Sequence, residues 1–322
     1  MICNVQSAIA TFLPMKPLRL AAFVTAGFAY AVIVIGFIVR ITGSGMGCGD
    51  HWPTCNGRLI PIFDSPEVAI EFGHRLAVLG LGIMAVTVAG LALAGRREPG
   101  AGGRGGTVRP ALLVVALLAV QSALGAVTVK LELPPHTVVL HLGTGLALLA
   151  TLVVLGLRAG VLAGVTAPPA GLTRGRGGIV GAVALGALVV LLGGMTATSG
   201  AASACTGFPL CSGQIWPTGG SGGLAHIHWT HRLLAYALFL HLLGVAVGLR
   251  RKGASGAILT AGWVVFGLAM AQIVAGAAMV LAYLPPLLRG VHAALGTAVW
   301  VGLVYLGWLT AGRRSGVQAP TR

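Results

Sequence analysis

Four histidines of the sequence form two pairs at matching positions within long apolar segments. His74 and His141 belong to the first half of the chain, and His231 and His292 belong to the second half. Two imidazoles that face each other between helices are a natural axial pair for haem iron. Zinc usually takes four ligands with thiolate or carboxylate among them, whereas the ligand types alone leave copper open. Hydrogen bonding between helices is the alternative, but ionisable side chains in lipid are expensive and mostly functional, so we favour ligation.

One carboxylate distinguishes the two pairs. Glu71 precedes His74 by three residues and therefore shares its helical face, whereas His228 holds the matching position before His231. A carboxylate beside a haem can transfer protons or orient a substrate. The alternative is an interfacial glutamate that balances a nearby arginine. We interpret Glu71 as the candidate catalytic residue.

Three arginines each lie within three residues of a predicted ligand: Arg75, Arg232 and Arg289. A guanidinium in this position can bind a haem propionate, and we assign Arg289 to the second haem site on this basis. The alternative for all three is that the side chains extend along the helix to the membrane interface.

Four cysteines form two closely spaced pairs, Cys48 with Cys55 and Cys205 with Cys211. Both spacings are compatible with disulfides, which an oxidising compartment outside the membrane would permit. The first pair is either a structural staple or a thiol–disulfide exchange site that passes electrons toward the first haem. We interpret the second pair as structural and Cys3, in the N-terminal tail, as a free thiol.

The segments that carry these residues are apolar enough to cross a membrane. Of 322 residues, 56% are hydrophobic and 8% are charged, and the mean hydropathy is +0.93. A soluble domain is about 25% charged, so this surface must face lipid. A crossing needs about 20 apolar residues, and lipid forces the backbone into helices. We expect eight transmembrane helices, at about 18–40, 67–94, 109–130, 137–158, 178–197, 225–249, 256–282 and 289–311.

The basic residues predict how these helices are oriented. Most of the 21 Lys and Arg residues fall in the two terminal segments and in the loops at 95–109, 158–177 and 250–255, which all share one side. The positive-inside rule therefore places both termini in the cytoplasm. The net charge of +15 is then mainly a topology signal, and we expect no nucleic-acid partner.

The two halves of the chain repeat each other. The pattern Pro53-x-Cys55-x-Gly57-x-x-x-Pro61 recurs 156 residues later, and His74-Arg75-Leu76 recurs as His231-Arg232-Leu233. Each half carries four predicted helices, so both halves have the same orientation, which disfavours an inverted-repeat transporter. We predict an all-α membrane protein of two tandem four-helix bundles, residues 1–165 and 166–322, related by a pseudo-two-fold axis along the membrane normal.

The motifs at Gly43–Cys48, Trp52–Gly57 and Glu71–Arg75, with their second-half counterparts, resemble haem A synthase of the bacterial type, from about residue 18 to 311. The resemblance implies oxidation of the C8 methyl group of haem O to a formyl group, which gives haem A for terminal oxidases. It implies that His74 and His141 frame the substrate haem, with Glu71 as the acid needed there. It further implies that His231 and His292 hold a haem B cofactor.

The same resemblance implies the bacterial cell membrane as the location and haem O synthase as a partner. It also implies an electron donor or acceptor, either a quinone or a thiol protein. Two alternatives remain open from the residues alone. One is a di-haem, cytochrome b-like carrier that moves electrons between quinone and outer thiols. The other is a thiol-oxidising membrane protein in which haem is incidental.

Overall fold

Eight long helices dominate the computed structural model, which describes residues 15–103, 105–165, 175–218 and 223–311. All eight are long and apolar enough to cross a membrane, so the chain is a multi-pass membrane protein. The prediction of an all-α fold with eight spans is confirmed, and the predicted bounds differ from the observed ones by about one turn at most. In chain order the helices are α2 (Met15–Ile41), α3 (Pro66–Ala94), α4 (Val108–Lys130), α5 (Pro135–Leu162), α6 (Arg176–Thr198), α7 (Leu224–Arg251), α8 (Ala257–Leu281) and α9 (Pro286–Thr310).

Local sequence signals explain several helix ends. Proline stands at the first position of α3, α5 and α9, where its missing N–H loses no helical hydrogen bond. Before α5 and before α9 the chain makes the same tight turn, with two successive non-glycine residues at positive φ: Glu132 and Leu133, then Tyr283 and Leu284. The repeated Leu-Pro-Pro sequence thus forms the same turn in both halves.

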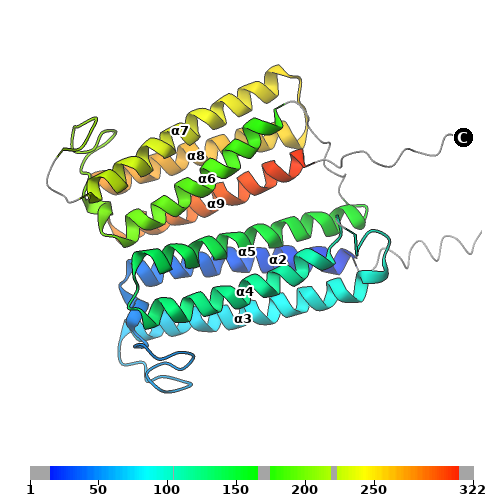
Figure 1. Ribbon diagram of the computed structural model, residues 1–322, viewed down its shortest axis with the longest axis horizontal. Coiled ribbons are helices and arrows are strands. Elements are labelled where there is room, and N and C mark those ends of the chain that lie inside the picture. Colours follow the sequence, from blue (N-terminus) through cyan, green and yellow to red (C-terminus); the bar gives the residue numbers. More distant parts are fainter. Residues whose placement is uncertain (1–14, 104, 166–174, 219–222, 312–322) are drawn as a thin grey trace, which may run out of the picture.

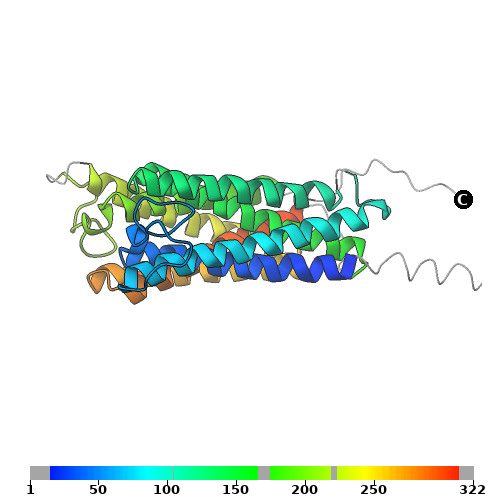
Figure 2. The ribbon, with the colours of Figure 1, turned by 90° about the horizontal axis from the view of Figure 1, so that it is seen from below.

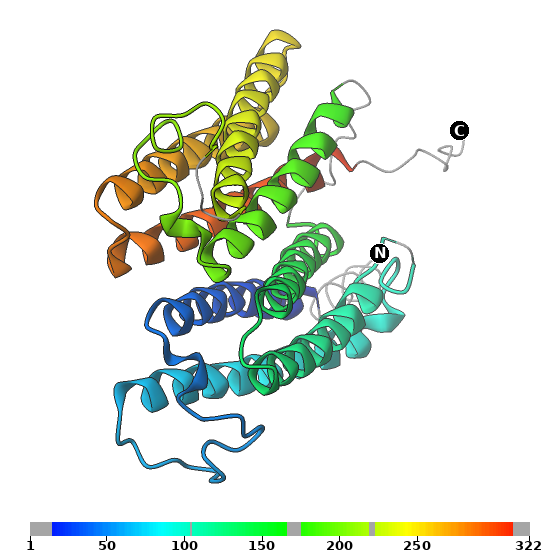
Figure 3. The same ribbon diagram turned by 60° about the vertical axis from the view of Figure 1, so that its left-hand side comes forward.

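The helices pack in two groups of four (Figures 1 and 3). Helices α2 to α5 contact one another in a ring, and α6 to α9 do the same. The two groups meet through α2 and α5 on one side and α6 and α9 on the other. The predicted boundary between the halves, at residues 165 and 166, lies between α5 and α6 at the edge of a segment outside the described residues. The pseudo-two-fold axis stays a prediction.

Small and branched apolar residues fill the interior of each group, and Leu149 and Leu152 of α5 and Leu242 of α7 are fully buried there. Two side chains also join the groups across their interface. Tyr30 Oη donates to the Ala294 carbonyl at 2.8 Å, and Trp300 Nε1 donates to the Leu146 carbonyl at 3.0 Å.

The two cysteine-containing loops lie at the same end of the molecule, opposite the end at which α2 begins (Figures 1 and 2). The first disulfide loop comprises residues 42–65, and the second comprises residues 199–223, of which 199–218 and 223 are described. Each begins with a short 3-10 helix, Ser44–Met46 (η1) in the first loop and Ala201–Ser203 (η3) in the second. We call this end of the molecule the loop end.

Candidate haem-binding sites

The structure brings each predicted histidine pair together toward the loop end of its own helix group. His74 lies two turns into α3, and His141 lies in the second turn of α5. The two side chains are close enough for their charges to interact. His231 on α7 and His292 on α9 are related in the same way. Each half therefore carries one pair of imidazoles from two of its helices.

Each of these four rings packs against a glycine of a neighbouring helix. A Cβ built on Gly36 or Gly125 would lie 3.4 or 3.2 Å from Cε1 of His74 or His141. A Cβ on Gly193 or Gly276 would lie 2.9 or 3.0 Å from Cε1 of His231 or His292. A Cβ at Gly193 would force its histidine ring to shift, and a Cβ at Gly125 or Gly276 would make a tight contact, whereas a Cβ at Gly36 would make an ordinary van der Waals contact. Sequence analysis did not single out these glycines as site residues, although their spacings of 157 and 151 residues repeat those of the histidines.

In the part of the chain that the structure describes, the Nδ1 atoms of the four predicted ligand histidines are left without a partner, whereas Nε2 of His292 is hydrogen-bonded to the Gln272 side-chain amide at 3.1 Å. Nδ1 is buried in His74, His141, His231 and His292, and among the described residues none of these atoms has a hydrogen-bond partner. A buried unpaired nitrogen is costly, and native structures usually satisfy it. Paired imidazoles that each keep an unpartnered Nδ1 and pack against a glycine are of the residue type that would ligate haem iron. Within the described residues, no group of three or more His, Cys, Asp or Glu side chains is placed to hold a metal ion.

Glu71 is buried and bonded at both carboxylate oxygens. The residue is 4% exposed; Oε1 accepts from Arg75 Nη2 at 2.6 Å, and Oε2 accepts from the backbone N–H of Cys48 at 2.8 Å. Arg75 also donates through Nη1 to the carbonyls of His51 at 2.9 Å and Thr54 at 2.6 Å. The pair therefore holds the first disulfide loop onto α3.

The second half repeats this anchor with a histidine in place of the carboxylate. Arg232 Nε donates to His228 Nε2 at 3.1 Å, and His228 Nδ1 donates to the Ala201 carbonyl at 3.0 Å. The Arg232 guanidinium also donates to the carbonyls of Cys205, Gly207 and Leu210 at 3.0, 2.9 and 2.8 Å. Propionate binding and extension to the interface stay untested for Arg75 and Arg232, and anchoring of the disulfide loop is a role that neither interpretation included. Each guanidinium is engaged by the disulfide loop above it.

Arg289 differs from these two arginines. It is half-buried one turn before His292 on α9, and it makes no hydrogen bond or ion pair with any described residue. Its guanidinium is thus available to an anionic group beside His292.

Both cysteine pairs are joined as disulfides, Cys48 to Cys55 and Cys205 to Cys211. All four half-cystines are buried against the first turns of α3 or α7. In each loop the second cysteine closes a short hairpin, through Cys55 N to the Arg58 carbonyl and through Cys211 N to the Gln214 carbonyl. The first disulfide adjoins Glu71 through the Cys48 N–H, so it touches the site that carries the carboxylate. Cys3 lies outside the described residues.

The eight-helix fold and its two histidine pairs define a multi-pass membrane protein. Residues 19–304 match the COX15-CtaA family, described as cytochrome oxidase assembly proteins, and the chain belongs to this family.

Several similar proteins carry the name heme A synthase. One from Symbiobacterium thermophilum is 32% identical over 310 residues, which cover 92% of this chain and 96% of that protein. One from Geobacillus thermodenitrificans is 29% identical over 283 residues, 85% of this chain and 86% of that protein. One from Alkalihalophilus pseudofirmus is 32% identical over 232 residues, 71% and 75% of the two chains.

Proposed function

We propose that this protein is a haem A synthase of the bacterial plasma membrane, with both termini in the cytoplasm. The reaction is oxidation of the C8 methyl group of haem O to a formyl group. Membership of the family and the similarity to proteins named heme A synthase support this proposal. The observation that carries it in this chain is that two equivalent histidine pairs differ in one neighbour, Glu71 against His228.

We assign the substrate to the first half, residues 1–165, and a haem B cofactor to the second half, residues 166–322. His74 and His141 hold haem O in the first half. His231 and His292 ligate haem B in the second, where Arg289 binds a propionate. Haem B supplies one-electron redox chemistry at the second site. Haem O synthase is the expected source of substrate, and a quinone or a thiol protein is the class of redox partner.

Glu71 is the catalytic carboxylate in this proposal. Its ion pair with Arg75 holds the carboxylate in place, three residues from His74 on the same helix. A fixed negative charge stabilises positive charge that develops on the substrate during methyl oxidation, without reorganisation at the moment of reaction. The Cys48 N–H holds the other carboxylate oxygen, so the position of the charge depends on the first disulfide loop.

Haem analysis tests the proposed activity and the proposed haem content together. The protein is expressed in a host that lacks its own haem A synthase but makes haem O, and total haems are extracted and separated by chromatography. Appearance of haem A supports the proposed activity. A purified protein that contains haem B alone, in a host that accumulates haem O without forming haem A, would instead indicate the di-haem electron carrier.

A further inference from the structure

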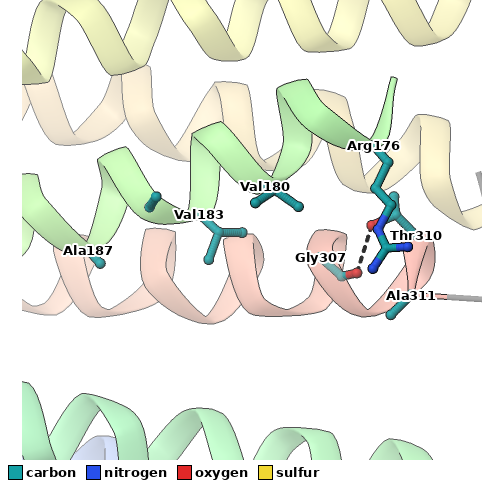
Figure 4. Close-up of a pocket in the computed structure, with 8 residues that line it drawn as sticks. Arg176, Val180, Val183, Ala187, Gly307, Thr310 and Ala311 are labelled. Carbon is teal, nitrogen blue, oxygen red and sulfur yellow. Dashed lines mark hydrogen bonds between the residues drawn. The ribbon is translucent and has the colours of Figure 1, made fainter. Parts of the chain in front are cut away.

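A groove between α6 and α9 (Figure 4) lies near the start of α6 and the end of α9, at the end of the molecule opposite the disulfide loops (Figure 1). Its volume is about 390 Å³, which is within the range of small-molecule sites. Val180, Val183 and Ala187 of α6 and Gly307 of α9 form its apolar wall, and Arg176 and Thr310 lie at its polar end. We call this feature the α6–α9 groove.

The first half of the chain shows why the groove is there. Gly36 and Gly193, which pack against His74 and His231, are 157 residues apart. The last residues of α2 and α6 have the same spacing, so Val180 corresponds to Phe23. Gly307 corresponds to Gly156 at the spacing of 151 residues that relates α5 to α9. In the first half the Phe23 ring packs directly on Gly156, where a Cβ would lie 2.9 Å from Cζ. The second half has valine instead of the ring, and the unfilled space is the groove.

The polar end of the groove differs between the halves in the same way. Arg176 corresponds to Arg19, whose guanidinium lies over the Phe23 ring, 5.7 Å from its centroid. No described residue forms a hydrogen bond or ion pair with Arg176, which is exposed. Figure 4 shows its side chain extending from α6 toward Gly307 and Thr310 on α9. Lys252 adds a second cation nearby, because its Nζ would lie 3.5 Å from a Cβ on Gly175, the residue before Arg176.

We propose that the α6–α9 groove binds one acyl chain of an anionic phospholipid, with the lipid phosphate at Arg176. The eleven steps from Arg176 to Ala187 rise about 16 Å along α6, close to the roughly 15 Å depth of one leaflet's hydrocarbon layer. Arginine binds phosphate through paired, charge-assisted hydrogen bonds, and basic pockets between helices on the cytoplasmic side bind lipid headgroups. Arg176 lies on the side to which the arginine distribution assigns the cytoplasm, so the lipid belongs to the cytoplasmic leaflet.

The test is native mass spectrometry of the full-length protein, purified in detergent and titrated with phosphatidylglycerol or phosphatidylcholine. The unaltered protein is expected to retain one phosphatidylglycerol and to prefer it over phosphatidylcholine. Val180→Phe places the first-half ring in the groove and should abolish this retention. Arg176→Gln removes a charged hydrogen-bond donor and should weaken phosphatidylglycerol binding about tenfold or more, while binding of phosphatidylcholine changes less.

Leu188→Phe is the matched control, because it adds a ring on the same helix at a side chain that is 51% exposed and does not line the groove. It should retain lipid as the unaltered protein does. Haem content verifies that each variant is folded. Equal retention by Val180→Phe and the unaltered protein would mean that the lipid is merely peripheral and would overturn the proposal. Preferential retention of an added neutral quinone would overturn the proposal in favour of a quinone. A gain of lipid in a variant that ends at Ala311 would overturn it in favour of the chain's own C-terminal residues.

Discussion

Replacing Glu71 with histidine separates the two roles that the structure gives to this side chain. Glu71 anchors the first disulfide loop through Arg75 and the Cys48 N–H, and in our proposal it also supplies catalytic charge. His228 shows that a histidine can perform the anchoring role, because it accepts from Arg232 and donates to the Ala201 carbonyl. Ala201 is the first residue of η3, and Ser44 is the first residue of η1. The Ser44 carbonyl in the first half therefore corresponds to the Ala201 carbonyl.

The magnitudes follow from these contacts. Glu71→Ala leaves a half-buried arginine without its counter-ion, which costs about 3–5 kcal/mol when the pair is fully buried and less here, and leaves the Cys48 N–H unpaired, at about 1–3 kcal/mol. Two carbonyl acceptors remain for Arg75. We therefore expect the free energy that holds the first disulfide loop on α3 to fall by about 3 kcal/mol. Glu71→His should recover most of this loss. It should nevertheless lower haem A formation by about 10²- to 10³-fold, as removal of one preorganised electrostatic group does.

The assay combines two measurements on Glu71→Ala, Glu71→His and the unaltered protein. Proteolysis of the first disulfide loop reports anchoring, and chromatography of total haems reports haem A formation. We expect both variants to bind haem in both halves, with Glu71→His resistant to proteolysis and inactive. His228→Ala is the control in the second half and should keep substantial activity. Near-normal haem A from Glu71→His would refute the catalytic role and leave Glu71 as a loop anchor alone.

Three further predictions concern the ligands, the glycines and the disulfides. His231→Ala should remove the bound haem B from a protein that is still folded; an unchanged six-coordinate absorption spectrum would contradict the ligand assignment. Gly193→Ala should lower haem content more than Gly36→Ala, because its Cβ would lie 2.9 rather than 3.4 Å from the histidine ring; pyridine haemochrome analysis measures both, and the reverse order would argue against this packing. Cys48→Ser should impair turnover more than Cys205→Ser if the first disulfide takes part in electron or haem transfer, whereas equal, mild losses would point to stapling alone.

The helices and the histidine pairs could be predicted from the sequence because both depend on local pattern. A lipid environment leaves an apolar segment no alternative to the helix, and the repeated Leu-Pro-Pro turns mark where α5 and α9 begin. His74 and His231 stand out because ionisable residues within such a segment are energetically costly and usually functional. Two halves with the same helix order then place both pairs at the same end of the molecule.

The roles of Arg75, Arg232 and the glycines could not be predicted in this way. Arg75 bonds to carbonyls of residues more than 20 positions earlier, and only the folded path of the first disulfide loop brings those carbonyls to α3. The arginines follow the predicted ligands directly, which suggested a haem contact but did not indicate the contacts with the loop. The role of Gly36 and Gly193 follows only from the folded structure, in which histidine rings from neighbouring helices pack against them.

The haem content of variants that lack one histidine pair tests the central claim most directly. The unaltered protein, purified from a host that makes haem O, should carry haem B together with haem O or haem A. Loss of His74 and His141 should remove haem O and haem A and leave haem B. Loss of His231 and His292 should remove haem B. If either double variant instead loses half of a single haem B pool, with no haem O or haem A in the unaltered protein, the two halves do not divide substrate from cofactor, and the account is wrong.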